Sequence, residues 1–312
     1  LASYHLFVGI DQMINWGNDQ IQVFPSKLVW FWQDHGQLIS IKLPSIIGDF
    51  LVFFVLSRFN RFGLIAGLAY LVNPAVWYNT AFWGQTDGLV AGLSLLSLYN
   101  LKIGKIKTAS LFLGLSLITK ASWTPVLPFW LIYVWKKYPS RILDTAIAPI
   151  VALFTALPFH PGFDLFRWLI DLYNQRILPG ESAFITVNAF NFWHLFFSAD
   201  RIPQNAPFFG LPAYLVGYSL VAVIVVFLLY SLIKNEINFP RLLFHLTIVF
   251  FSLFLFSPRM HERYLFPLFP LLFLQSAVTG SKTSILFGLL LSPFYLINLY
   301  SQWWAPGNAF LQ

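Results

Sequence analysis

The chain has 312 residues and a net charge of +7, yet only 10% of its residues are charged, 58% are hydrophobic and the mean hydropathy is +0.69. This composition excludes an ordinary soluble domain, because most side chains need the bilayer as their solvent. The absence of cysteine excludes disulfides and thiol chemistry. We therefore predict one all-α membrane domain over residues 1–312, a polytopic bundle of transmembrane helices with exoplasmic juxtamembrane helices.

Apolar stretches of the chain predict about ten membrane helices. They cover residues 41–58, 63–79, 88–101, 107–119, 123–135, 142–158, 211–233, 242–257, 264–279 and 283–300. Several are shorter than the roughly 20 residues that cross a bilayer. We expect tilted or broken helices on either side of Lys120, where Pro125 and Pro128 also free backbone groups.

Basic residues predict the orientation of these helices. Eleven of the 19 Lys and Arg residues fall in alternate connections, and by the positive-inside rule these connections face the cytoplasm. The eleven residues are Arg58, Arg61, Lys102, Lys105, Lys107, Lys136, Lys137, Arg141, Lys234, Arg241 and Lys282. The positive charge is thus a topology signal, and it is a poor argument for nucleic acid, which requires basic residues on one exposed face.

The opposite, exoplasmic side then receives residues 1–40, residues 159–210 and two polar turns, with nine of the 12 acidic residues. These acids are Asp11, Asp19, Asp34, Asp87, Asp164, Asp171, Glu181, Asp200 and Glu262. Between residues 163 and 176 apolar and charged side chains alternate in a way typical of an amphipathic helix in the interface plane. They are Phe163, Phe166, Trp168, Leu169, Leu172 and Tyr173, with Asp164, Arg167, Asp171 and Arg176.

The two polar turns are Trp83–Asp87 and Arg259–Tyr264, and each interrupts an apolar run. Polar groups at membrane depth are costly, which makes them candidates for function. Asp87 could accept sugar hydroxyls or act as a general base, or it could simply cap a helix that begins at Gly88. The functional interpretation is favoured, because a cap does not require the Trp-Gly-Gln that precedes it. Asp49, inside the 41–58 stretch, fits a buried structural contact as well as a catalytic role.

Several motifs occur in a specific order along residues 41–270. They are Ile41–Asp49 (IKLPSIIGD), Asn73–Pro74, Trp83–Asp87 (WGQTD), Lys120 with Pro125, Asn188–Trp193 (NAFNFW) and His261–Tyr264 (HERY) with Pro267 and Pro270. In this order the chain resembles the GT-C glycosyltransferases, most closely the bacterial proteins related to the second mannosyltransferase of GPI-anchor synthesis. It is similar, more distantly, to the dolichyl-phosphate-glucose-dependent glucosyltransferases of asparagine-linked glycosylation.

The resemblance implies a hexosyltransferase of the bacterial plasma membrane. It moves a mannose-like or glucose-like sugar from a polyprenyl-phosphate donor to a lipid-linked or surface glycan on the exoplasmic side. The implied donor-phosphate residues are Lys120, Arg259, His261, Glu262, Arg263 and Tyr264. The implied substrate-binding residues are Trp83, Gln85, Asn188, Asn191 and Trp193, with Asp87 as a carboxylate at the reaction centre. Cations in the first set suit phosphate oxygens, which Arg binds bidentately.

The catalytic base of this family is usually an Asp in the first exoplasmic loop, ahead of a Tyr-Pro-Pro segment. The sequence contains neither, and residues Ser3–Phe7 resemble the juxtamembrane helix that follows that segment. We therefore expect the first membrane helix and the main base to lie upstream of Leu1, with Asp87 in a supporting role. Of the acids in residues 1–40, none carries a matching motif.

Cofactors and rival functions complete the predictions. No His-x-x-x-His or comparable spacing predicts a metal site, although some GT-C relatives use a divalent ion such as Mg or Mn near the donor phosphate, and that alternative stays open. No nucleotide-binding motif occurs. A lipid-linked oligosaccharide flippase or transporter is one rival, against which the lack of an internal repeat argues. A polysaccharide ligase or polymerase is the other.

Overall fold

The computed structural model describes residues 2–22, 24–160, 162, 164–172, 174–175, 183–197 and 202–303, and over these ranges the predicted all-α fold is confirmed. The longer helices are α1 (Ala2–Ile21), α2 (Ser26–Ser57), α3 (Arg61–Leu71), α5 (Asp87–Lys102), α6 (Ile106–Thr119), α7 (Val126–Lys137), α8 (Ile147–Ala156), α10 (Ala213–Lys234), α11 (Phe239–Phe256), α12 (Leu268–Thr279) and α13 (Lys282–Trp303). The shorter ones are α4 (Pro74–Trp77) and α9 (Leu165–Leu172). Two small strand pairs join β1 (Thr186–Val187) to β4 (Met260–His261) and β2 (Pro207–Phe208) to β3 (Leu211–Pro212).

Five helical segments of the described residues are long and apolar enough to cross a membrane, so the chain is a membrane protein. They are Ser26–Ser57, Pro139–Phe159, Ala213–Lys234, Phe239–Phe256 and Lys282–Ser301. Each of the ten predicted stretches contains helix, but the predicted number of ten spans is not confirmed. The physical reason is length, since α3 and α6 are apolar but shorter than the roughly 20 residues that cross a bilayer of ordinary thickness.

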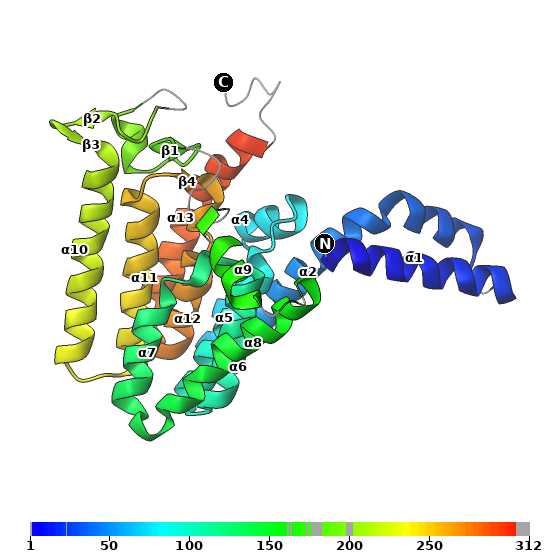
Figure 1. Cartoon of the computed structure of the whole chain (residues 1–312), viewed down its shortest axis with the longest axis horizontal. Coiled ribbons are helices and arrows are strands. Elements are labelled where there is room, and N and C mark those ends of the chain that lie inside the picture. The colour runs from blue at the N-terminus through cyan, green and yellow to red at the C-terminus, as the bar shows by residue number, and fades with distance from the viewer. Residues whose placement is uncertain are drawn as a thin grey trace.

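The polar turns and the basic connections lie at opposite ends of the bundle. We call the end with the Trp83–Asp87 and Arg259–Tyr264 turns the polar end; the small strands lie there, at the top of Figure 1. The other end, the basic end, gathers the connections after α2, α5, α7, α10 and α12. There Lys102 Nζ lies 4.3 Å from the centre of the Phe59 ring, and Lys136 Nζ donates to the Ile233 carbonyl at 2.6 Å. The basic connections and the polar turns, which alternate along the chain, therefore lie at opposite ends of the bundle.

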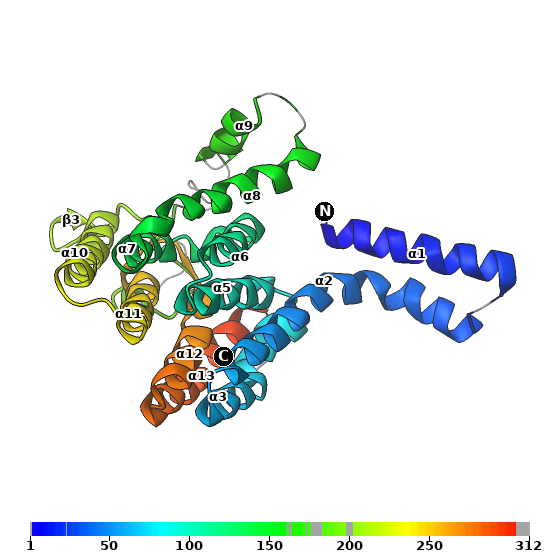
Figure 2. The ribbon, with the colours of Figure 1, turned by 90° about the horizontal axis from the view of Figure 1, so that it is seen from below.

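Residues 1–40, predicted as an exoplasmic region that begins with a juxtamembrane helix, are almost entirely helical. Helix α1 and the first part of α2 form a hairpin that projects from one side of the bundle (Figures 1 and 2). Pro44 lies inside α2, where proline removes a helical hydrogen bond and bends the axis. The hairpin exposes Trp16 (66%) and Trp30 (64%), and because it projects outward, its acids take no part in the polar end.

The predicted amphipathic helix is present as α9, although Phe163, Tyr173, Arg176, Glu181 and Asp200 lie outside the described residues. Phe166 on α9 is 67% exposed. At its start the His160 ring stacks on Trp168 with 5.0 Å between ring centres, and Nε2 of His160 lies 2.8 Å from Asp164 Oδ1. An exposed apolar face beside charged residues is what an interfacial helix requires.

Helices α2 and α5 pack so closely that their backbones touch, and this contact positions the Trp83–Asp87 turn. A Cβ atom on Gly48 would collide with the backbone of Gly88 and Leu89. Next to it, Ser45 Oγ donates to the Gln85 carbonyl at 2.5 Å and accepts from the Gly88 N–H at 3.0 Å. Small residues allow such close approach of membrane helices, and here they fix the start of α5 against α2.

We expect Gly48→Ala to lower stability by about 1–3 kcal/mol or more, because the added methyl group must push two backbones apart. Gly9→Ala is the matched control, since nothing lies within 4 Å of the corresponding Cβ in α1, and there alanine should be neutral or slightly stabilising. Thermal unfolding of the detergent-solubilised protein measures both. Equal midpoints for the two variants would contradict the proposed helix contact.

Candidate functional site

Asp87, the first residue of α5, carries a nearly buried carboxylate that is 4% exposed. Its Oδ1 lies 2.6 Å from Lys120 Nζ, and its Oδ2 accepts from Asn79 Nδ2 at 3.3 Å. The alternative that Asp87 caps a helix starting at Gly88 is wrong: the helix includes Asp87, and the preceding residue Thr86 is the cap position. The carboxylate is thus held by side chains from two other segments, which orient it at the polar end.

The chain reaches Asp87 through an unusual turn. After α4, which begins with Pro at its first position and is capped by Asn73, residues Tyr78–Phe82 form a π-helical turn. The Trp83 N–H then bonds to the Tyr78 carbonyl at 2.8 Å and the Gln85 N–H to the Asn79 carbonyl at 3.0 Å. Gly84 between them has a φ of +84°, a conformation that glycine adopts without strain. Short π-helical turns are frequent at functional sites.

Asp49 supports this turn from inside the bundle. Its Oδ1 accepts from the Tyr70 hydroxyl at 2.7 Å, and its Oδ2 accepts from Thr80 Oγ1 at 2.5 Å. Thr80 belongs to the π-helical turn, so Asp49 links α2 and α3 to the segment that carries Asn79. These contacts favour the structural alternative for Asp49 over a catalytic one.

The second polar turn carries a buried acid surrounded by basic groups. Glu262 is 3% exposed; its Oε1 accepts from Arg263 Nη1 at 2.8 Å, and His261 Nδ1 lies 3.8 Å from its Oε2. The Tyr295 hydroxyl, from α13, donates to the Arg263 carbonyl at 3.1 Å. The His261 ring meets Tyr264 edge-on with 5.0 Å between centres. Glu262 therefore holds Arg263 in place.

The two turns meet although they are far apart in the sequence. The Arg263 guanidinium lies 5.8 Å from the centre of the Trp83 ring and 5.5 Å from that of Tyr264. The structure thus brings Asp87, Lys120 and Trp83 together with the Glu262–Tyr264 group.

Arg259 lies at the outer edge of this group and is held by the loop before α10. Its Nε donates to Gln204 Oε1 at 2.8 Å, and its backbone N–H donates to the Ile185 carbonyl at 3.1 Å. Its φ of +60° is in the left-handed region, which is uncommon for residues other than glycine. The neighbouring β1 and β4 pair in parallel, so the loop that carries Asn188 lies directly on the Arg259–Tyr264 turn.

Three of the predicted substrate-binding residues are engaged in holding that loop. Trp193 is fully buried, and its Nε1 donates to the Phe256 carbonyl at 2.7 Å. Asn191 Nδ2 donates to the Phe254 carbonyl at 3.1 Å, while the Asn188 carbonyl accepts from Asn298 Nδ2 at 2.8 Å. In this structure no face of the Trp193 ring is open to a sugar, and all three residues tie the loop to α11 and α13.

Other residues of the site carry no motif that sequence reasoning could use. The buried polar atoms that have no hydrogen-bond partner within the described residues include the Tyr78 hydroxyl, Asn79 Oδ1 and, on the predicted residue Arg263, Nε. Such atoms are costly and call for a partner, which a bound substrate can supply. Lys42 of α2 adds a cation, with Nζ 5.8 Å from the centre of the Phe82 ring beside the turn. The only sequence signal for Lys42, Tyr78 and Asn79 is their polarity within an apolar segment.

Glu262 also gives a prediction for pH. Burial alone raises its pKa, but the His261 ring, its own backbone and the Arg263 charge outweigh this and hold the pKa below its ordinary 4.5. A lowered pKa means that the carboxylate contributes stability above pH 4.5, and that this contribution is lost as pH falls further towards the lowered value. We expect the midpoint difference in thermal unfolding between wild type and Glu262→Gln to shrink below pH 4.5. A difference that stays constant to pH 3.5 would contradict the ion pair.

No three His, Asp or Glu side chains of the described ranges gather as potential metal ligands. A comparison with protein-family models and with curated proteins gives no match to the chain.

Proposed function

We propose that the protein is a GT-C-type glycosyltransferase that moves a hexose from a polyprenyl-phosphate donor to a glycan acceptor. The observation that carries this proposal is the contact between Trp83 and Arg263. Through this contact the Asp87–Lys120 pair lies close to the Glu262–Arg263 pair at the polar end of an apolar bundle. A donor with an isoprenoid tail and a phosphate head needs this combination, because the tail favours the bilayer while the phosphate favours cations at its surface.

The residues divide into two roles. Arg263 presents an unpartnered Nε beside Trp83 and, with His261 and Arg259, neutralises the donor phosphate. An acceptor hydroxyl loses its proton to a carboxylate and its oxygen bonds to the anomeric carbon. The bond between that carbon and the phosphate oxygen breaks, and the phosphate leaves with the electron pair, which inverts the configuration. Asp87 accepts hydrogen bonds from sugar hydroxyls and supports this deprotonation, held in place by Lys120 and Asn79.

The proposal places the polar end on the exoplasmic side of a bacterial plasma membrane, with the basic end in the cytoplasm. The opposite placement of polar turns and basic connections, together with the positive-inside rule, supports it. The proposed topology uses all ten predicted crossings, the shorter helices crossing in a locally thinned bilayer or continuing through the turns at their ends.

Two measurements on the intact protein in detergent test the proposal. Binding of a synthetic polyprenyl-phosphate sugar is the first, and transfer of radiolabelled sugar from it to a lipid-linked glycan is the second. Saturable binding with transfer supports the enzyme. Translocation of the carrier in vesicles without transfer would instead support a flippase, and joining of whole glycan chains would support a ligase or polymerase.

A further inference from the structure

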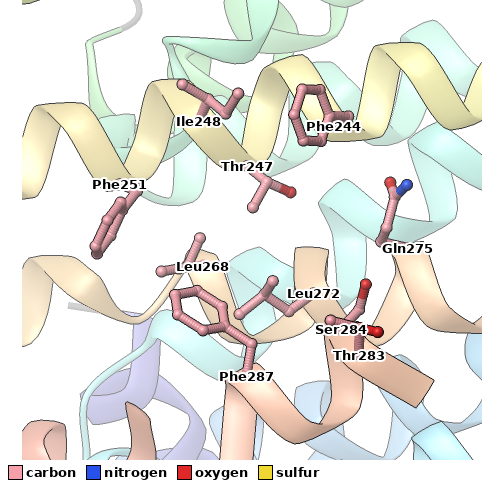
Figure 3. A pocket seen from close by; sticks show the side chains of 10 residues that line it. All are labelled: Phe244, Thr247, Ile248, Phe251, Leu268, Leu272, Gln275, Thr283, Ser284 and Phe287. Carbon is pink, nitrogen blue, oxygen red and sulfur yellow. The ribbon is translucent and has the colours of Figure 1, made fainter. Parts of the chain in front are cut away.

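A crevice of about 270 Å³ opens between α11, α12 and α13 (Figure 3). One part of its wall is apolar and includes Phe251, Leu268 and Phe287. The other part carries polar side chains, among them Gln275 and Ser284. None of the residues that line it belongs to the candidate functional site, so the crevice needs a separate explanation.

The polar part of the crevice lies at the basic end of the bundle. Gln275 stands near the end of α12, two residues before Ala277, whose carbonyl accepts from Asn60 Nδ2 at 3.2 Å in the connection after α2. Ser284 is in the first turn of α13, which begins at Lys282. Lys282 is exposed and makes no ion pair within the described residues. Lys282 does not line the crevice, but it directly precedes Thr283, which does. The crevice thus has a polar, hydroxyl-bearing mouth with a cation on the neighbouring residue, and an apolar wall that extends towards the middle of the helices.

Gln275 provides an independent observation. Its Oε1 is buried and accepts no hydrogen bond from any described residue, and Figure 3 shows its amide directed into the gap between α11 and α12. An unsatisfied buried acceptor destabilises the fold, and lipid tails beside it cannot satisfy it. A ligand that donates a hydrogen bond at the mouth and fills the apolar interior would remove both penalties.

We propose that this crevice binds one anionic phospholipid, with an acyl chain against Phe251 and Leu268 and the head group at the mouth. The phosphate then pairs with Lys282, and a head-group hydroxyl, such as that of phosphatidylglycerol, donates to Gln275 Oε1. Basic pockets between membrane helices are known to select anionic head groups. The inference does not depend on the proposed transferase activity, because it uses the opposite end of the bundle.

Native mass spectrometry of the delipidated protein with added phosphatidylglycerol or phosphatidylcholine of equal chain length tests the proposal. We expect one retained phosphatidylglycerol per chain and weaker retention of phosphatidylcholine. Lys282→Gln should weaken phosphatidylglycerol binding about fivefold, and should weaken phosphatidylcholine binding less, because the choline cation offsets the charge of its phosphate. Ser284→Phe fills the mouth, and Thr247→Phe fills the crevice from the facing wall on α11. Both variants should abolish lipid retention.

Leu286→Phe is the matched control, since this side chain on the same helix is 57% exposed and does not line the crevice; it should retain lipid like wild type. Equal retention of the two lipids by wild type, or undiminished retention by both filled variants, would overturn the proposal. Preferential retention of polyprenyl phosphate would also overturn it, by making the crevice part of a donor site. A dimer that retains no lipid in the crevice would also overturn the proposal, because the crevice would then be covered by a second copy of the chain.

Discussion

Arg263→Gln is expected to reduce sugar transfer by about 100-fold or more, because it removes a preorganised cation from the departing phosphate. The variant also leaves the buried Glu262 carboxylate without its 2.8 Å partner, and breaking a buried pair costs about 3–5 kcal/mol. Binding of the polyprenyl-phosphate sugar and its transfer are therefore measured at equal folded fractions, established by thermal unfolding.

Two further variants separate charge from folding. Glu262→Gln combined with Arg263→Gln removes the unpaired acid, so stability should recover while transfer stays low. Arg263→Lys retains the charge but loses the planar fork that binds phosphate oxygens in pairs, and intermediate activity is expected. Arg141→Gln is the matched control, because Arg141 pairs with Asp144 at the basic end, where no effect on transfer is expected. Normal transfer by a folded Arg263→Gln protein would refute the phosphate role.

Asp87→Asn is the second variant with a large expected effect, a loss of transfer of about 100-fold. The amide keeps the shape of the side chain but loses the negative charge that accepts hydrogen bonds from sugar hydroxyls, and it removes the ionic partner of Lys120, 2.6 Å away. Donor binding should change much less than turnover, since the phosphate is assigned to the other turn. The measurement is the initial rate of transfer at saturating donor, together with the donor Kd.

The control and partner variants for Asp87 follow from the ion pairs. Asp144→Asn breaks a pair at the opposite end and should leave the rate unchanged. Lys120→Gln alone frees the Asp87 carboxylate, and the double variant should be little worse than Asp87→Asn, since the two residues act as one unit. If Asp87→Asn transfers sugar at the wild-type rate, the carboxylate is a structural group, and the proposed role is wrong.

Much of the helical architecture could be predicted, because long apolar runs in a membrane have few alternatives to helix. Every predicted stretch contains helix, and the amphipathic pattern around Trp168 predicted α9. The number of spans could not be predicted, because it depends on whether helices as short as α3 and α6 reach across the bilayer. The helical hairpin in residues 1–40 could not be predicted for another reason. Polar and apolar side chains mix there, so no clear apolar stretch marks the two helices that pair.

Within the candidate site, the polarity of the two turns predicted Asp87 and the Arg259–Tyr264 group, and the family resemblance added Lys120; the structure brings these together. The resemblance also assigned Trp193 to substrate, whereas the structure buries it completely. A motif gives the order of residues but not which way a side chain faces. Asn79, which completes the surroundings of Asp87, has no motif and was not predicted.

The sequence by itself determined that this is a helical membrane protein and which of its turns are polar or basic, because hydrophobic runs and charge placement are local properties of a chain in a bilayer. Only the tertiary structure decided which polar groups meet. The contact between Trp83 and Arg263 depends on how α5, α12 and α13 pack, and on backbone contact at Gly48 that fixes α5 against α2. Such long-range packing is set by the shapes of many side chains at once, so no single segment encodes it.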